Sequence, residues 1–178
     1  PTVSNSSIVF VHADDLWKVG RDGGDAVRLT SAVGSEIYPR FSPDGKWVYV
    51  GAEEDDKLDI IDVAKRTQVK QLTVAARPRG TAFSSDGKFA YTACEQADTL
   101  FKIDVAEQKI VGKVKAGGRS NGVIVSPDNN TVYVSNGKDG TVSFIDSATL
   151  SVRATVAVGQ RPWNMALSRD GAKLYVAN

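Results

Sequence analysis

The chain has 178 residues, of which 42% are hydrophobic and 24% are charged, and its net charge is +1. This balance argues against a nucleic-acid-binding protein or a membrane-surface protein, because both usually carry a clear basic excess. One cysteine excludes an internal disulfide, and one histidine excludes a His-rich metal or catalytic site.

The first residues predict the strands of one small sheet. Strands are expected at 8–12, 16–20 and 26–30, with a short one at 2–4, because apolar residues dominate or alternate there. The run Asp22-Gly23-Gly24-Asp25 is typical of a hairpin turn. Further on, Glu53-Glu54-Asp55-Asp56 is interpreted as a solvated acidic turn. A cation site is the alternative, since carboxylates bind hard metal ions, although the oxygen-ligand spacing of a known metal loop is missing.

Four series of residues then recur every 42 positions, and together they cover nearly the whole chain. They are the turn positions Asp44, Asp86, Asp128 and Asp170; the serines 42, 84, 126 and 168; the tyrosines 49, 91, 133 and 175; and the arginines 77, 119 and 161, with Ser35 in the earliest copy. Repetition at one period indicates a repeat architecture in which each unit packs on its neighbours.

Within each period the pattern predicts four strands and no helix. In the third copy these strands are 122–126, 131–135, 141–146 and 151–158, separated by turn-rich segments. Four antiparallel strands in about 42 residues are typical of one β-propeller blade. We therefore predict an all-β fold, a β-propeller of about four blades plus a partial blade. Its parts are the N-terminal strands at 1–37, full blades at 38–79, 80–121 and 122–163, and a partial closing blade at 164–178.

Two propeller families resemble different parts of the chain. Val132-Tyr133-Val134-Ser135-Asn136 and Leu174-Tyr175-Val176-Ala177-Asn178 resemble the Tyr-Val-Thr-Asn motif of YVTN-repeat β-propellers, and this resemblance covers about residues 50–178. Residues 1–49, with Asp14-Asp15-Leu16-Trp17 and Pro43-Asp44-Gly45-Lys46, resemble the propeller repeats of TolB and tricorn-protease relatives. The resemblance implies a periplasmic or extracellular protein. A natural mosaic and an engineered fusion of two propeller fragments are both open interpretations.

Arginines at equivalent positions form the main candidate site. Arg77, Arg119 and Arg161 fall on loops that lead from the outer strand of one blade to the inner strand of the next. In a ring they would converge on one rim, together with Arg79, and make a positive funnel suited to carboxylate, phosphate or sugar-acid groups. The alternative is that each arginine binds backbone carbonyls of the adjacent blade or lies in solvent.

Three further residues are expected in the same loops. Asn121, Trp163 and Asn164 are candidate ligand contacts. The Trp163 ring is expected either to stack on a ligand ring or to cap the apolar core between blades.

The sequence contains no catalytic constellation. It has no Ser-His-Asp or Cys-His set, no Gly-rich phosphate loop, no zinc-ligand set and no haem-attachment pair. We therefore expect no enzymatic activity and no cofactor. No apolar run approaches the roughly 20 residues of a membrane-spanning helix, so a membrane is not an expected partner. Because the net charge is only +1, a nucleic acid is not an expected partner either.

Two function hypotheses follow. The first is a non-catalytic scaffold or binding module, natural or engineered, that binds a small anion or a protein. The second is the propeller portion of a larger periplasmic enzyme, either a tricorn-like protease or a cofactor-dependent dehydrogenase. The end of the chain within a blade favours a fragment or an engineered chain under either hypothesis. We also expect self-association, in which two open arcs of blades pair as a dimer that completes a ring; the alternative is a single closed ring in which the C-terminal strands at 164–178 join the N-terminal strands as a shared blade.

Overall fold

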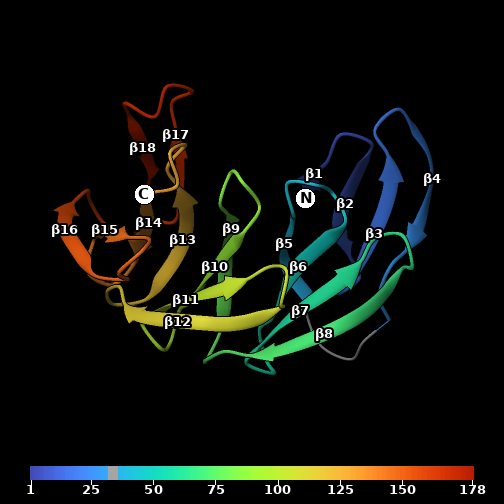
Figure 1. Cartoon of the computed structure of the whole chain (residues 1–178), viewed down its shortest axis with the longest axis horizontal. Coiled ribbons are helices and arrows are strands. Elements are labelled where there is room, and N and C mark those ends of the chain that lie inside the picture. Colours follow the sequence, from blue (N-terminus) through green and yellow to red (C-terminus); the bar gives the residue numbers. More distant parts are fainter. Residues whose placement is uncertain (32–35) are drawn as a thin grey trace. The chain divides into compact units, whose positions relative to one another are not determined.

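The structure of the protein is a computed structural model that describes residues 1–31 and 36–178, so that Ser35 lies outside the described residues. The described residues form strands and turns without a helix, which confirms the all-β prediction. None of them forms a helix long and apolar enough to cross a membrane. The strands group into four four-stranded sheets and one two-stranded sheet, as predicted for four blades and a partial blade (Figure 1). The chain divides into two compact units, Pro1–Pro78 and Arg79–Asn178, which are described separately as unit 1 and unit 2.

Unit 1 contains two sheets, each with its strands in sequence order. The first contains β1 (Thr2–Val3), β2 (Ser7–His12), β3 (Asp15–Gly20) and β4 (Gly23–Arg28), and the second contains β5 (Glu36–Phe41), β6 (Trp47–Ala52), β7 (Lys57–Asp62) and β8 (Thr67–Thr73). The sheets share one apolar core, formed by Val9, Leu16, Leu29, Phe41, Val48, Val50, Ile61 and Val63. Burial of each such side chain stabilises the fold by roughly 1.5–3 kcal/mol, which offsets the entropy lost in ordering the strands.

The outer strand of the first sheet begins earlier than predicted. β4 begins at Gly23 rather than at Ala26, and Gly20 pairs with Gly23, so that the hairpin turn is Arg21-Asp22. Gly23 and Gly24 have positive φ angles of 97° and 101°, and they are the first residues of the strand rather than the turn. The physical reason is that a two-residue turn closes the hairpin without them.

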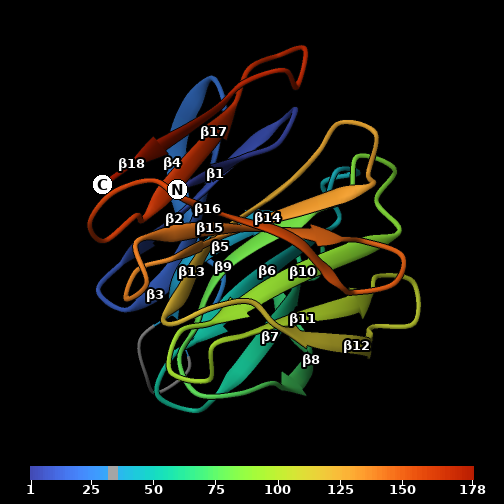
Figure 2. The ribbon, with the colours of Figure 1, turned by 90° about the vertical axis from the view of Figure 1, so that its left-hand side faces the viewer.

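Unit 2 contains the remaining sheets. They are β9 (Pro78–Phe83) with β10 (Phe89–Cys94), β11 (Thr99–Asp104) and β12 (Lys109–Lys115); β13 (Ser120–Val125) with β14 (Thr131–Asn136), β15 (Thr141–Asp146) and β16 (Val152–Ala157); and the hairpin of β17 (Asn164–Leu167) and β18 (Leu174–Ala177). The inner strand β13 contacts both β10 and β17, so the three sheets follow one another face to face (Figure 2). The two four-stranded sheets share an apolar core that contains Tyr91, Leu100, Val123, Val132, Val134 and Ile145.

The recurring Ser-x-Asp turns have one hydrogen-bond pattern in all four copies. Each serine hydroxyl donates to the aspartate two residues later, at 2.5–2.6 Å. The same aspartate accepts the N–H two residues further on, and the serine oxygen accepts the N–H five residues after the serine, at or just before the start of the next strand. These turns therefore close each inner hairpin through side chains as well as through the backbone.

We expect these turns to make the protein sensitive to acid. The hydrogen bond from the paired serine holds the pKa of Asp86, Asp128 and Asp170 below the ordinary value of 3.8. A carboxyl whose pKa is lowered on folding stabilises the fold above its unfolded pKa, and that stabilisation is lost as the pH falls through the folded pKa. The urea midpoint should therefore fall below about pH 4, where the unfolded carboxyls begin to bind protons.

Asparagine at positions 44, 86, 128 and 170 provides the test, because the amide oxygen still accepts hydrogen bonds but does not ionise. The fourfold Asp→Asn variant should lose less stability than the parent between pH 6 and pH 2.5, as measured by urea unfolding. Asp22→Asn changes a charge outside the repeat turns and serves as the control. An unchanged pH slope in the fourfold variant would contradict this account.

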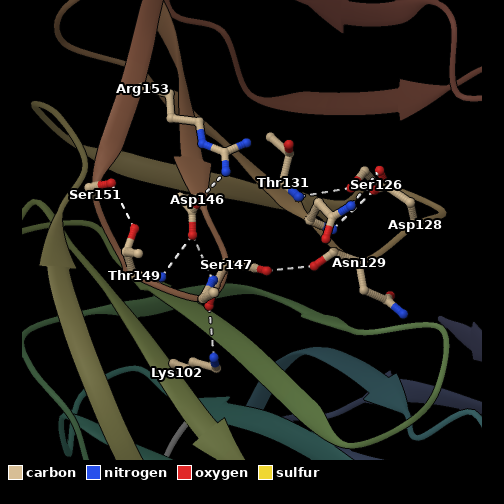
Figure 3. Close-up of polar contacts among 12 residues, drawn as sticks. Lys102, Ser126, Asp128, Asn129, Thr131, Asp146, Ser147, Thr149, Ser151 and Arg153 are labelled. Atoms are coloured by element: carbon tan, nitrogen blue, oxygen red, sulfur yellow. Dashed lines mark hydrogen bonds and ion pairs between the residues drawn. The ribbon is translucent and has the colours of Figure 1, made fainter.

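A polar connection joins the two four-stranded sheets of unit 2 (Figure 3). Lys102 on β11 donates to the Ser147 carbonyl oxygen at 2.7 Å, and its ammonium lies 4.0 Å from the centroid of the Phe89 ring. The Ser147 hydroxyl in turn donates to the Asn129 carbonyl oxygen at 2.6 Å. Burial lowers the pKa of Lys102. The connection belongs to the packing between these two sheets and uses none of the predicted site residues.

Candidate functional site

The three repeated arginines occupy one unusual backbone conformation. Arg77 lies between β8 and β9, Arg119 between β12 and β13, and Arg161 between β16 and β17, and their φ angles are 59°, 55° and 52°. Positive φ is uncommon for a residue with a Cβ, because the side chain crowds the carbonyl oxygen. The loop therefore turns sharply at the same residue in each copy, just before the inner strand begins.

In unit 1, two acidic residues of the preceding loop bind Arg77. The Arg77 N–H donates to Asp56 at 3.2 Å, and the Arg77 guanidinium forms an ion pair with Glu53. The sequence predicted a solvated acidic turn at 53–56, but two of its carboxylates bind Arg77. The prediction missed this pairing, although the spacing of 21 residues between Asp56 and Arg77 recurs in the next copy.

In unit 2, Arg119 is preceded by acidic residues at both equivalent positions, whereas Arg161 is preceded by neither. The Arg119 N–H donates to Asp98 at 2.7 Å, and a terminal nitrogen of its guanidinium lies 3.8 Å from Glu95. One repeat later, Gly137 and Gly140 occupy the positions of these two acids. Among the described residues, the Arg161 guanidinium forms no ion pair with a carboxylate.

A cavity of about 460 Å³ opens between these loops of unit 2. It is lined by Glu95, Arg119, Asn121, Gly137, Lys138, Arg161 and Trp163. Three lining side chains are cationic and one is anionic, so the lining has a net positive charge. A hollow of this size falls in the range of small-ligand sites, roughly 300–1,000 Å³. Guanidinium and ammonium groups that converge on one hollow attract carboxylate and phosphate groups.

A buried ion pair supports the wall of this cavity. Arg79 on β9 donates from Nε to Glu95 Oε2 at 2.8 Å, and the side chains of both residues are about nine-tenths buried. The Arg79 guanidinium carbon lies 6.0 Å from the centroid of the Trp163 ring, within reach of a weak cation–π contact. Glu95 thus compensates the charge of Arg79, and Arg79 contacts the ring that forms the wall.

The backbone of Trp163 is held from two sides. Its N–H donates to the Ala177 carbonyl oxygen at 2.8 Å, and its carbonyl oxygen accepts a hydrogen bond from the buried Ser135 hydroxyl at 2.9 Å. The Ser135 oxygen also accepts the Gly122 N–H at 2.9 Å. A Cβ on Gly122 would lie only 2.4 Å from the Trp163 carbonyl oxygen, so this close approach of β13 requires glycine.

The structure thus brings together four predicted site residues, Arg119, Asn121, Arg161 and Trp163, around one cavity, with Arg79 beside them. Arg77 belongs to unit 1 and is bound by Glu53 and Asp56. Asn164 pairs with Ala177 at the start of β17 and does not line the cavity.

One residue expected in a loop is in a strand instead. Asn121 is in β13, and Asn164 is the first residue of β17. The inner strand begins at Ser120 rather than at Gly122, because the loop has already turned at Arg119. The sequence analysis also missed Glu95 and Lys138. The available signal was that the acidic residues at 95 and 98 are replaced by glycines at 137 and 140 in the next repeat.

Unit 1 contains a separate group of buried carboxylates. Burial raises the pKa of Glu36, and the charges of Asp59 and Asp15 raise it further, although a hydrogen bond from Thr30 opposes them. Burial likewise raises the pKa of Asp59. No group of three or more His, Cys, Asp or Glu side chains within residues 1–31 and 36–178 has the geometry of a metal site.

Comparison with solved structures identifies the fold. A chain of hydrazine synthase from Kuenenia stuttgartiensis is 20% identical, with a TM-score of 0.76 over 82% of this chain and 44% of that one. A functionally unknown protein from Desulfotomaculum acetoxidans DSM 771 is 15% identical, with a TM-score of 0.84 over 99% of this chain and 61% of that one. At these identities the likeness concerns the fold alone, and the chain spans less than two thirds of each protein.

Sequence comparison adds the family. The search among curated proteins gave no match. The family model of the tricorn protease N-terminal β-propeller domain matches residues 1–143, well over half of the chain and far beyond the residues 1–49 whose motifs resemble tricorn relatives. This match and the repeated four-stranded antiparallel sheets together show that the chain belongs to the tricorn protease N-terminal β-propeller domain family.

Proposed function

We propose that the chain is a non-catalytic propeller module that binds small organic anions in the cavity of unit 2. One observation carries the proposal: Arg161 faces this cavity after its repeat has exchanged both acidic partners for Gly137 and Gly140. In the other two copies an acid lies within ion-pair distance of the equivalent arginine: Glu53 pairs with Arg77, and Glu95 lies 3.8 Å from Arg119. A carboxylate or phosphate group of a ligand would take the place that these acids leave empty in the third copy.

The neighbouring side chains favour the same class of ligand. The Arg119 side chain is 63% exposed and its guanidinium is 3.8 Å from Glu95, which leaves it accessible to an anion. Lys138 is exposed at the same cavity. Asn121 is buried and adds a side-chain amide, which both donates and accepts hydrogen bonds.

Restoring the lost acid tests the proposal directly. Gly137 has space for a side chain, because a Cβ on this residue would lie 3.6 Å from its nearest neighbouring atom. Gly137→Glu should abolish the binding of citrate measured by isothermal titration calorimetry, because its carboxylate would pair with Arg161. Gly137→Gln has nearly the same size without the charge, and it should retain most of the binding.

The arginines provide a second comparison in the same assay. Arg161→Ala should weaken citrate binding roughly tenfold, about the value of one charge-assisted hydrogen bond. Arg77→Ala removes the equivalent side chain in unit 1, where Glu53 holds it, and should leave the affinity unchanged. Equal affinities of the parent, Arg161→Ala and Gly137→Glu would refute the anion site.

The family assignment favours a second candidate function, the propeller portion of a larger enzyme. The family is named for the N-terminal propeller of a protease, and the chain spans 44% of the hydrazine synthase chain. In that role the same cavity would hold an anionic group of the substrate or of its product. Citrate would then bind as it does to an independent module, so that the calorimetric test applies to both candidates.

A further inference from the structure

The cavity of unit 2 continues into a second hollow. This second hollow has a volume of about 440 Å³ and is lined by the turn Gly137–Gly140, by Ala157 at the end of β16, and by Gly159, Gln160 and Arg161. The two hollows share Gly137, Lys138 and Arg161. Lys138 and Arg161 therefore stand at the junction of a longer groove, which exceeds what a single small anion would fill.

Charged side chains of both signs line this groove. Glu95 and Arg119 lie in the first hollow, the cations Lys138 and Arg161 lie at the junction, and Asp139 lies in the second hollow. Carboxylates accept hydrogen bonds and repel anions, whereas the central cations attract them. The order thus suits a ligand with a negative group at the junction and hydroxyl donors on both sides of it. A polyanion without hydroxyl groups would place negative charge against Glu95 and Asp139.

The walls distinguish the two hollows further. Trp163 supplies a flat apolar ring in the first hollow, on which the C–H face of a sugar ring packs well. The second hollow has three glycines and Ala157 in its lining, so that a ligand approaches the backbone closely there. Gln160 and Asp139 provide hydrogen-bonding groups at this end.

We propose that the groove binds an acidic oligosaccharide of at least two residues, with one ring on Trp163, a carboxylate at Lys138 and Arg161, and the next residue in the second hollow. This proposal rests on the anion site proposed above and names the ligand that the site takes. The added residue should make hydrogen bonds in the second hollow that a monosaccharide leaves unmade.

Calorimetry with glucuronate, and with a di- and a trisaccharide that each carry this single uronate among neutral sugar residues, provides the test on the full chain. The trisaccharide should bind roughly tenfold more tightly than the monosaccharide, and neutral galactose oligomers should not bind measurably. Ala157→Phe fills the second hollow from an exposed strand position and should remove most of this gain. Ala154→Phe, exposed on the same strand but outside both hollows, should keep the gain.

Three results would overturn the proposal: equal affinities for the mono- and trisaccharide, an unchanged gain in Ala157→Phe, or an equal gain along a series of aspartate oligomers. Citrate separates these failures from failure of the anion site. If citrate binds while uronate affinity is independent of length, the anion site stands and the oligosaccharide is excluded. If neither citrate nor any uronate binds, the anion site itself is wrong.

Discussion

Replacing Gly122 with alanine should destabilise the protein by about 3 kcal/mol or more, because the new Cβ would overlap backbone that has no room to move. That Cβ would lie 2.4 Å from the Trp163 carbonyl oxygen and 3.0 Å from the Ser135 hydroxyl. The Trp163 backbone is bound to Ala177 on one side and to Ser135 on the other, so relief requires separating β13 from β17.

Urea unfolding followed by circular dichroism measures this effect. Gly137→Ala is the matched control, because its Cβ would lie 3.6 Å from the nearest atom and Gly137 does not have a positive φ. We expect the control to change the free energy of unfolding by less than about 1 kcal/mol. Since Gly122 positions Trp163, its variant should also bind citrate and uronates more weakly. Similar stabilities of the two variants would show that the strands have more freedom than this packing implies.

Replacing Glu95 with glutamine should have effects of opposite sign on stability and on anion binding. The substitution removes the carboxylate that accepts the Arg79 Nε–H at 2.8 Å, next to a guanidinium whose side chain is only 11% exposed. Loss of one member of a buried ion pair typically costs about 3 kcal/mol, because the remaining charge is no longer compensated. The cavity loses its one anionic lining residue at the same time, and citrate should therefore bind more tightly than to the parent.

A double-mutant cycle separates the pair from its surroundings. Arg79→Met combined with Glu95→Met should be less destabilised than the sum of the single variants, since no buried charge is left unpaired. Glu107→Gln breaks the ion pair with Lys109, in which both side chains are more than half exposed, and should not change stability measurably. A stability loss in Glu95→Gln no larger than that in Glu107→Gln would contradict the importance of burial.

The architecture of the sheets was largely predictable, because the 42-residue period and the alternation of period two are local properties of the chain. The repeated turns at Ser84, Asp86 and their equivalents close hairpins through side chains two to five residues apart, which sequence spacing identifies. The inner strand β13 begins two residues before its predicted start, because a positive φ at Arg119 is not visible in the pattern of apolar residues. The YVTN resemblance, the fusion of two fragments, the periplasmic location and the dimer remain predictions.

The candidate site was predictable only in part. The spacing of arginines pointed to Arg119 and Arg161, and Trp163 was expected nearby, but the same spacing included Arg77 with equal weight. Contact with carboxylates distinguishes these arginines, since Glu53 binds Arg77 whereas glycines occupy the two acidic positions that precede Arg161. Comparing the loops at 53–56, 95–98 and 137–140 copy by copy would have revealed this difference from the sequence.

The sequence alone determined the strands, their turns and the repeat, because hydrogen bonding within a hairpin and burial of alternate side chains depend on residues close in the chain. Only the tertiary structure decided that Arg79 on β9, Glu95 after β10 and Trp163 before β17 meet at one cavity. These residues are up to 84 positions apart, and their contact depends on how successive sheets pack. The charge of the cavity follows from which cations have a carboxylate within reach, and that is a property of distances in the folded chain.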